Sequence, residues 1–319
     1  MEKSDREGTV IRQNLGHYFV SANSKVIDCA LSTLLRKQLQ YPEASPGSRR
    51  RRVESVRSVR VVDPVAVGDR VHFEEGEGGT GMIHEVLPRR NKISRRASGT
   101  SRKEQILAAN VDQLIPVFSA DDPPADLDLL DRMLGIAEWQ SVPAVVCFNK
   151  IDLAETAKET MAMYEQVGYR VVYTSVISDQ GKEPFQDLLK DRISLLMGPS
   201  GTGKSSLLNW IQPGLGLRTA EISKTTREGR HTTTHTELFE VTENGFAGDL
   251  PGAREFSLWD IQQEDVPLLF QEFGPLLGQC RFRDCSHVHE PECAIKKGVE
   301  EGQISRRRYS SYLRMRSKP

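Results

Sequence analysis

The residues with the clearest chemical potential lie in one glycine-rich stretch, GPSGTGKSS, at residues 198–206. The stretch fits the P-loop pattern G-x-x-x-x-G-K-[ST], in which glycines let successive backbone N–H groups point at phosphate oxygens. Lys204 would place its charge on the β- and γ-phosphates of a nucleotide, and the hydroxyl of Ser205 would bind Mg²⁺. The candidate phosphate-binding residues are Gly198, Pro199, Ser200, Gly201, Thr202, Gly203, Lys204, Ser205 and Ser206.

A second motif, NKID at residues 149–152, is suited to recognise guanine. The carboxylate of Asp152 can accept hydrogen bonds from N1 and N2 of guanine, whereas adenine would leave that buried charge unpaired. Asn149 would support the loop, and Lys150 would lay its methylene stem across the base. Thr174 and Ser175 follow the next predicted strand, so they could back the base from the other side.

Two later segments predict the rest of a nucleotide site. Asp249, at a predicted strand end, can hold Mg²⁺ through water, and Gly252 can turn its N–H toward the γ-phosphate. Between the P-loop and Asp249, the threonines of RHTTTH could close onto Mg²⁺ when GTP is bound, with Thr233 and Thr234 as candidates. The alternative is a Thr-rich strand, and we expect a loop as far as Thr233 or Thr234, followed by a strand.

These segments occur in an unusual order along the chain. The base-reading residues precede the phosphate loop, and the residues expected to sense Mg²⁺ and the γ-phosphate come last. This is a rotation of the usual order in GTPases, and a sheet tolerates it if the original chain ends lay close together. Together the motifs predict a guanine-nucleotide domain with permuted connectivity.

A cluster of cysteine and histidine predicts a metal site near the C-terminus. Three thiolates and one imidazole suit tetrahedral Zn²⁺ in a closed structural site. The set is Cys280, Cys285, His287 and Cys293. His289 is a rival for His287, and three free thiols in a reducing compartment are the alternative for the cysteines. Cys29 and Cys147 lie in apolar runs, so we expect them to be buried free thiols.

The elements that must carry these motifs change along the chain. Residues 1–105 alternate apolar and polar side chains in short runs, with turns at Gly16 and in the Gly-rich stretch 76–81. They predict a small five-stranded barrel, a class that often binds nucleic acid on one face. Residues 106–260 alternate buried strands and amphipathic helices, which predicts a parallel sheet covered on both faces, with ligands beyond the strands' carboxyl ends. Residues 261–319 read as helical, then rich in Cys and His, then as a basic C-terminal helix.

Charge and hydropathy restrict the partners and the location. The 319-residue chain has a formal net charge of −1, but Lys and Arg concentrate in residues 49–60, 88–103 and 306–318. A basic run is usually a solvated face, yet three such runs favour an acidic partner such as RNA. No apolar run is long enough to cross a bilayer, and the first residues lack the apolar core of a signal peptide. We therefore expect a cytoplasmic protein without membrane attachment, and we expect a monomer.

Motifs spread over nearly the full length resemble one known family. In family order they are VGDRV, KEQILAANVDQL, FNKIDL, DRISLL, GPSGTGKSSLLN, GRHTTTH, DLPGAREF and CRFRDCSHVHEPECA. The chain is similar to the RsgA/YjeQ family of circularly permuted GTPases, which act in late maturation of the small ribosomal subunit. The resemblance implies an OB-fold at 1–105, a permuted α/β P-loop GTPase domain at 106–260 and a zinc-binding helical domain at 261–319. It also implies GTP with Mg²⁺, one structural zinc ion with His287 as its imidazole ligand, and the 30S subunit with its 16S rRNA as partners.

The chain departs from the family pattern beside the predicted γ-phosphate site. Leu250 and Ala253 stand where the family usually has Thr and Phe. Ala253 also takes the place of a water-orienting Gln in many GTPases, so unaided hydrolysis should be slow. His231 is then the candidate to position water once the ribosome orders its loop, and the alternative is a structural or RNA-facing histidine. We expect a GTP hydrolase stimulated by the 30S subunit, and the alternative is a GTP-sensing rRNA-binding scaffold with little catalysis.

Overall fold

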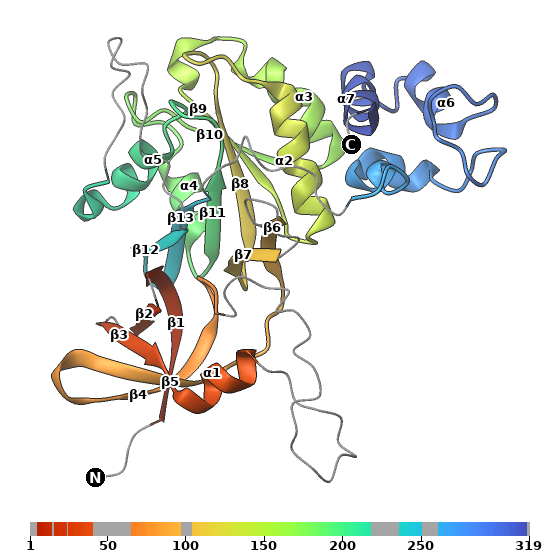
Figure 1. Ribbon diagram of the computed structural model, residues 1–319. Helices are drawn as coiled ribbons and strands as arrows, with labels where there is room; N and C mark the ends of the chain where they lie inside the picture. The colour runs from red at the N-terminus through yellow and green to blue at the C-terminus, as the bar shows by residue number, and fades with distance from the viewer. Residues whose placement is uncertain are drawn as a thin grey trace, which may run out of the picture.

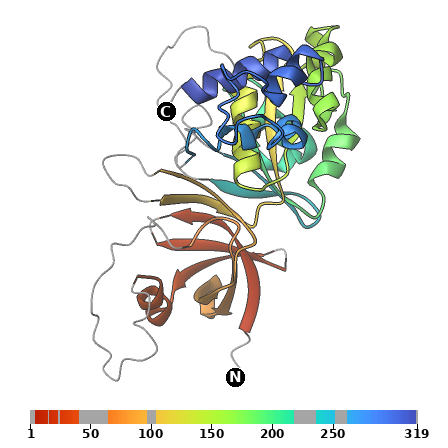
Figure 2. The ribbon, with the colours of Figure 1, turned by 90° about the vertical axis from the view of Figure 1, so that its right-hand side faces the viewer.

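The computed structural model places three structural regions in sequence: a β-barrel, a helix-covered sheet and a C-terminal lobe (Figure 1). It describes residues 5–14, 16–23, 25–40, 65–96, 104–217, 236–250 and 261–317. Figure 2 shows the barrel at one end of the sheet and the lobe lying against the helices of one sheet face. None of the helices in these ranges combines the length and apolar composition that a bilayer-spanning helix needs.

The N-terminal region is a closed five-stranded barrel, as predicted. Its strand order is β1-β2-β3-β5-β4. The strands are β1 (Asp5–Asn14), β2 (His17–Ala22), β3 (Lys25–Leu31), β4 (Arg70–Glu75) and β5 (Thr80–Val86), with helix α1 (Thr33–Gln40) packed beside them. Alternate positions of the strands point inward, and the buried set includes Val10, Val20, Ile27, Val71, Phe73 and Ile83. The predicted turn at Gly16 is confirmed, with a positive φ of 86° that suits glycine.

A short two-stranded sheet links the barrel to the central sheet. It pairs β6 (Lys92–Arg96) with β7 (Glu104–Ala109), so the boundary that we expected between residues 105 and 106 falls inside a strand. The fully buried carboxylate of Asp69 accepts two hydrogen bonds from Arg89, both of 2.6 Å. Gly68 lies against Ala109, where an added Cβ would stand 2.0 Å from the carbonyl oxygen. The link is therefore closely packed.

The central sheet has six strands in the order β10-β9-β8-β11-β13-β12. They are β8 (Gln113–Ser119), β9 (Val145–Asn149), β10 (Arg170–Tyr173), β11 (Ile193–Met197), β12 (Glu237–Thr242) and β13 (Gly245–Asp249). Five strands run parallel, but β12 is antiparallel to β13, which the prediction of a parallel sheet did not include. Only two residues join β12 to β13, and a parallel pair needs a crossover of roughly a dozen residues or more.

Helices cover both faces of this sheet, as predicted. α2 (Leu127–Trp139) and α3 (Ala157–Val167) bury their apolar sides in the core of one face. α4 (Lys182–Leu189) and α5 (Lys204–Ile211) do so on the other face. The apolar spacing in the sequence was therefore sufficient to identify the layers. Cys29 in the barrel and Cys147 in β9 are buried free thiols, which confirms that expectation.

The C-terminal lobe begins with two short 3₁₀ helices, Val266–Leu269 and Gln271–Leu276. Pro275, inside the second, lacks the N–H that an α-helix needs. α6 (Ala294–Glu300) and α7 (Arg306–Ser317) follow. The lobe's core is aromatic and includes Phe270, Phe273 and Tyr312.

Candidate functional site

The candidate phosphate loop joins β11 to α5, and its glycines are required by close contacts. An added Cβ at Gly198 would lie 2.2 Å from the carbonyl oxygen of Val117, and one at Gly203 would lie 2.3 Å from Nδ2 of Asn149. The buried hydroxyl of Thr202 donates to the carbonyl of Pro199 at 3.0 Å, which closes the loop on itself. α5 begins directly after the loop, and Ser205 and Ser206 lie in its first turn, where unpaired N–H groups favour anions.

Lys204 lies inside this loop. Its ammonium donates to the carbonyls of Gly198 at 2.9 Å and Pro199 at 3.1 Å, and it lies 4.0 Å from the carboxylate of Asp249. Burial lowers the pKa of Lys204 from its ordinary value, and the Asp249 charge opposes this shift. Lys204 is thus a buried ammonium in a loop suited to phosphate, beside a carboxylate suited to Mg²⁺.

Asn149 connects the candidate base loop to the phosphate loop. It is the last residue of β9 and is 2% exposed. Its Nδ2 donates to the carbonyl of Thr202 at 2.9 Å, and its Oδ1 accepts from the hydroxyl of Thr174 at 3.0 Å. One amide therefore fixes the separation of two loops that are distant in sequence.

Asp152 and Lys150 are also held by neighbours. The hydroxyl of Ser175 donates to Oδ1 of Asp152 at 2.5 Å, and the N–H of Ser178 donates to that hydroxyl at 3.1 Å. Lys150 adopts a left-handed backbone with φ of 57°, and its ammonium donates to the carbonyl of Asp122. The protein's own hydrogen bonds therefore set the orientation of the Asp152 carboxylate.

Residues 120–126 belong to this site, although the sequence analysis did not single them out. The N–H of Ala120 donates to the carbonyl of Asn149 at 2.9 Å, and an added Cβ at Gly201 would lie 3.3 Å from Cδ of Pro123. The signal was present in the sequence, since ADDPPAD directly follows a buried strand. β8 lies between β9 and β11, so the loop after it must meet the loops after both neighbours.

Part of the predicted site lies outside the described residues. This part comprises Gly252, His231, Thr233 and Thr234. Asp249 is the last residue of β13, and the N–H of Leu250 donates to the carbonyl of Leu196 in β11 at 2.8 Å. The strand that ends in Asp249 is therefore held beside the strand that leads into the phosphate loop.

The four predicted metal ligands come together in the C-terminal lobe. Their ligand atoms all lie within 4.8 Å of one another. Nδ1 of His287 lies 3.5 Å from Sγ of Cys280 and 3.4 Å from Sγ of Cys293, and the two sulfurs are 3.9 Å apart. With Zn–S bonds of about 2.3 Å, tetrahedral sulfur ligands lie about 3.8 Å apart, so the donor set fits a zinc-sized ion. The cluster contains His287 and not His289.

Helix α7 supports the metal loop through two tyrosines. The hydroxyl of Tyr309 donates to the carbonyl of His287 at 2.7 Å, and that of Tyr312 donates to the carbonyl of Ser286 at 2.5 Å. The N–H of Ala294, at the start of α6, donates to Sγ of Cys280 at 3.3 Å. These contacts fix the imidazole ligand and one sulfur relative to both helices of the lobe.

Comparison with known proteins identifies the family. Residues 86–259 match the family model described as RsgA GTPase. The small ribosomal subunit biogenesis GTPase RsgA of Moorella thermoacetica is 38% identical over 96% of this chain and 95% of its own length. The protein of that name from Gemmatimonas aurantiaca is 42% identical over 79% of this chain and 83% of its own length.

Two solved structures have the same architecture. YjeQ from Thermotoga maritima superposes with a TM-score of 0.77 at 32% identity, covering 99% of this chain and 98% of that protein. YloQ, a circularly permuted GTPase, superposes with a TM-score of 0.72 at 29% identity, covering 99% and 95%. The permuted motif order, the barrel, the P-loop geometry and the Cys₃His cluster all agree with this relationship. The chain therefore belongs to the RsgA GTPase family and is a circularly permuted GTP hydrolase.

Proposed function

We propose that this GTPase assists late assembly of the 30S ribosomal subunit and that the subunit stimulates its GTP hydrolysis. The proposal is supported by relatives named as small ribosomal subunit biogenesis GTPases, which align with 96% of the chain in one case. Such a factor works in the cytoplasm with GTP, GDP and 16S rRNA. We further propose that residues 1–105, 106–260 and 261–319 act as RNA-binding, GTPase and zinc-binding units of one monomer.

The nucleotide would bind where the base and phosphate loops meet. The observation that carries this assignment is the paired hydrogen bonding of Asn149, which links the two loops. Asp152 would select guanine, supported by Ser175, and Lys150 would cover the base. Lys204 would leave its carbonyl partners for the β- and γ-phosphates.

Ser205 and Asp249 would hold Mg²⁺, with Thr233 or Thr234 as a further ligand. When bound, the ion neutralises charge that develops on the phosphate oxygens during transfer. Gly252 would direct its N–H at the γ-phosphate, and His231 would position the attacking water. Because Ala253 has no side chain that can orient water, the reaction without the subunit should be slow.

The metal in the C-terminal lobe is proposed to be one structural zinc ion, held by three sulfurs and Nδ1 of His287.

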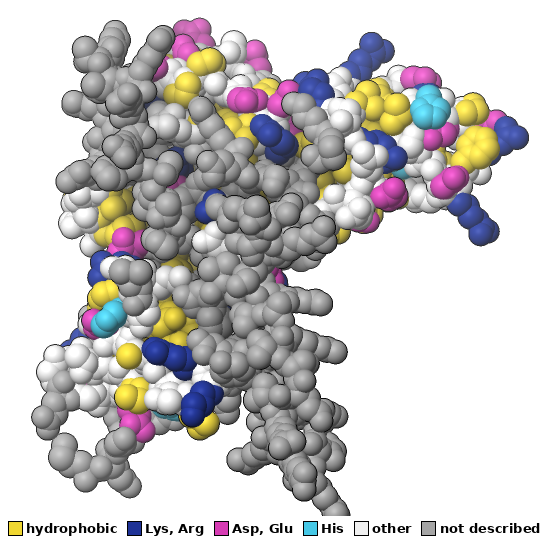
Figure 3. Space-filling view, viewed as in Figure 1, with side chains coloured by type: hydrophobic (Ala, Val, Ile, Leu, Met, Phe, Trp, Pro, Cys, Tyr) yellow, Lys and Arg dark blue, Asp and Glu magenta, His cyan; other side chains and the backbone are white. Residues whose placement is uncertain are grey.

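The lobe projects from the body of the protein and carries Lys and Arg side chains beside exposed hydrophobic ones (Figure 3). Phe282 is 40% exposed, with the Arg281 guanidinium 5.6 Å from its ring centre. On the barrel, Arg12 lies 3.9 Å over the ring of Phe19. Such cation–aromatic pairs suit contacts with RNA bases and phosphates.

The proposal is tested by measuring phosphate release from GTP with increasing concentrations of 30S subunits. We expect turnover to rise and then saturate, and we expect Lys204→Ala to lose both the basal and the stimulated rates. If the rate of phosphate release does not change with subunit concentration, while binding to the subunit depends on GTP, the non-catalytic scaffold is favoured instead. His231→Ala, measured in the same titration, tests whether this histidine acts in the stimulated reaction, since it should then lower the plateau and not the subunit affinity.

A further inference from the structure

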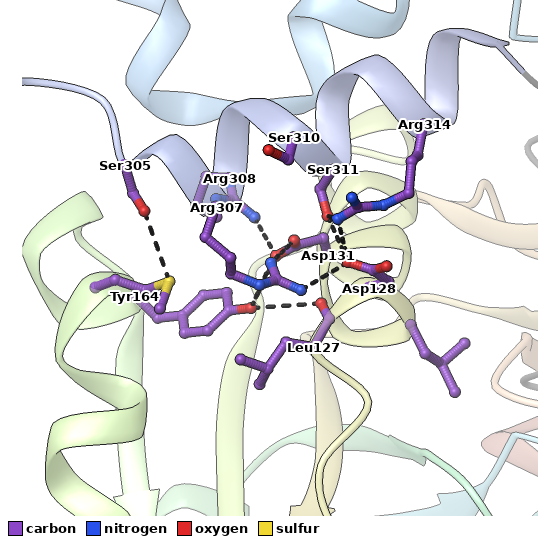
Figure 4. Close-up of polar contacts among 12 residues, drawn as sticks. Leu127, Asp128, Asp131, Tyr164, Ser305, Arg307, Arg308, Ser310, Ser311 and Arg314 are labelled. Carbon is purple, nitrogen blue, oxygen red and sulfur yellow. Dashed lines mark hydrogen bonds and ion pairs between the residues drawn. The ribbon is translucent and has the colours of Figure 1, made fainter. Parts of the chain in front are cut away.

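Helix α7 is held on α2 by a set of ion pairs (Figure 4). Arg307 pairs with Asp131 and, at 2.8 Å, with Asp128. Arg308 pairs with Asp131 at 2.6 Å. Arg314 reaches Asp128 at 2.6 Å. We call these five residues the arginine clamp. The C-terminal basic run therefore includes three arginines that bind the protein's own GTPase region, a role that the sequence analysis did not consider.

The centre of the arginine clamp is buried, and hydrogen bonds fix its geometry. The side chains of Arg308 and Asp131 are 1% and 0% exposed. The remaining nitrogens of Arg308 donate to both carboxylate oxygens of Glu272, at 2.7 and 2.9 Å. Three aromatic rings enclose the guanidinium, those of Phe270, Tyr164 and Tyr169. A buried guanidinium with this many partners has little freedom to move relative to α2.

The clamp acts on the first two turns of α2, directly after the loop at residues 120–126. Asp126 caps this helix by accepting hydrogen bonds from the N–H groups of Asp128 at 3.1 Å and Leu129 at 3.0 Å. Asp128 is thus held by the cap through its backbone and by α7 through its carboxylate. Any shift of α7 changes the support at the end of the loop.

The same loop contacts both halves of the nucleotide site. Its Asp122 carbonyl accepts from the ammonium of Lys150, and its Pro123 packs beside Gly201 of the phosphate loop. The hydroxyl of Ser119, at the end of β8, donates to the carbonyl of Pro123 at 2.6 Å. Asp122 has a left-handed backbone with φ of 46°, a conformation that persists only when surrounding contacts impose it.

We propose that the arginine clamp positions the loop at residues 120–126, so that docking of the C-terminal lobe sets the affinity of the nucleotide site. The clamp residues are positioning residues, because they act on the nucleotide only through α2 and this loop. The inference rests on the nucleotide site proposed above. It makes the lobe a regulator of GDP and GTP retention, since a partner that displaces α7 loosens the loop.

The test compares three single substitutions of arginines in α7. Arg307→Ala removes the contacts with both aspartates, and Arg314→Ala removes one exposed contact with Asp128. Arg316→Ala is the matched control, because Arg316 donates to the carbonyl of Gln263 in the lobe at 2.8 Å. Calorimetry gives the dissociation constant for GDP, steady-state kinetics gives KM and kcat for GTP, and thermal unfolding with metal content checks that each variant is folded.

We expect Arg307→Ala to raise the dissociation constant for GDP about five- to thirtyfold. Arg314→Ala should raise it less, and Arg316→Ala should bind GDP as the wild type does. KM for GTP should rise while kcat at saturation stays constant, because the loop contributes equally to ground-state and transition-state binding. Equal GDP affinity in all three folded variants would overturn the inference. If Arg307→Ala does not fold, the comparison of Arg314→Ala with Arg316→Ala decides it. Asp152→Asn distinguishes a failure of this inference from a failure of the proposed nucleotide site. If that variant still prefers guanine, the assignment of the nucleotide site is wrong.

Discussion

At the scale of residues, the side-chain amide of Asn149 sets the distance between the candidate base loop and the candidate phosphate loop. The hydroxyl of Thr174 donates to Oδ1 of Asn149, so the amide must present Nδ2 to the carbonyl of Thr202. The sulfur of Cys147 lies 3.4 Å from the same hydroxyl and adds a further weak partner. The orientation of the Asn149 side chain is therefore set by a residue on the neighbouring strand end.

Thr174→Val should weaken GDP binding, because it leaves Oδ1 of the buried Asn149 without its donor. Such a loss costs the folded protein about 1–3 kcal/mol. GDP binding weakens by the part of this cost that displaces the base loop, at about tenfold in the dissociation constant for each 1.4 kcal/mol. Thr174→Ser keeps the hydroxyl and should bind GDP nearly as tightly as the wild type. Calorimetric titration of both variants checks this, and equal affinities for Val and Ser at this position would contradict it.

The candidate residues of the nucleotide site could be proposed from the sequence, and the four residues of the Cys₃His cluster were predicted correctly to come together. Phosphate loops and Cys/His clusters bring most of their chemistry together within a short stretch, so residue type and spacing identify them. The arginines of α7 were not accessible in the same way. Nothing local distinguishes Arg308, which is buried against Asp131, from an arginine that faces solvent or RNA, because its partner lies far away in the chain.

At the scale of elements, the metal loop and α7 form one unit. The described part of the loop at residues 277–293 has no helix or strand, and it is held by the Cys₃His cluster and by the hydroxyls of Tyr309 and Tyr312. Since α7 also carries the three arginines of the arginine clamp, the state of the metal bears on how the lobe packs against α2. Elements predicted from periodicity agree with the structure where apolar spacing is regular, as in α2 and β9. The helical character expected after residue 261 takes the form of two 3₁₀ helices at 266–276.

Removing the metal should unfold this loop and release α7. Structural zinc sites contribute about 10 kcal/mol or more to the folding of their segment, and residues 277–293 form no helix or strand that could replace this contribution. Hydrogen exchange before and after chelation should show faster exchange in α7 and in the first turns of α2, and Cys285→Ser should do the same. His289→Ala is the control outside the cluster. Unchanged exchange in α7 of the metal-free protein would contradict a structural role for the ion.

At the scale of the whole molecule, the barrel is joined to the central sheet by the closely packed link, in which Val67 and Ile93 belong to the core of the sheet. Arg12 of β1 pairs with Glu237 of β12 at 3.1 Å, but both side chains are exposed, so the pair contributes only about 0–1 kcal/mol. The lobe is attached to the sheet region through buried ions instead. Both ends of the molecule are thus held by buried contacts, and the sequence could not reveal the attachment of the lobe because Arg308 and Asp131 are remote along the chain.

Binding to 30S subunits should weaken steeply with salt. Lys and Arg side chains that contact phosphates release counterions, so affinity falls by at least about tenfold between 50 and 200 mM salt when several contacts form. Equilibrium binding at four salt concentrations measures the slope, and nucleotide affinity measured alongside shows whether the protein itself has changed. An affinity for the subunit that is flat across this range would contradict RNA phosphates as the main contact.

The central claim is that separated segments form a single pocket selective for a guanine nucleotide. Calorimetry of GDP and ADP binding to the wild type and to Asp152→Asn tests it most directly. We predict that the wild type prefers GDP over ADP by at least about a hundredfold. Asp152→Asn should lose most of this preference, because the amide keeps one acceptor oxygen but turns its NH₂ toward the second guanine N–H donor. Equal binding of GDP and ADP by the wild type, or an unchanged preference in Asp152→Asn, would contradict the account.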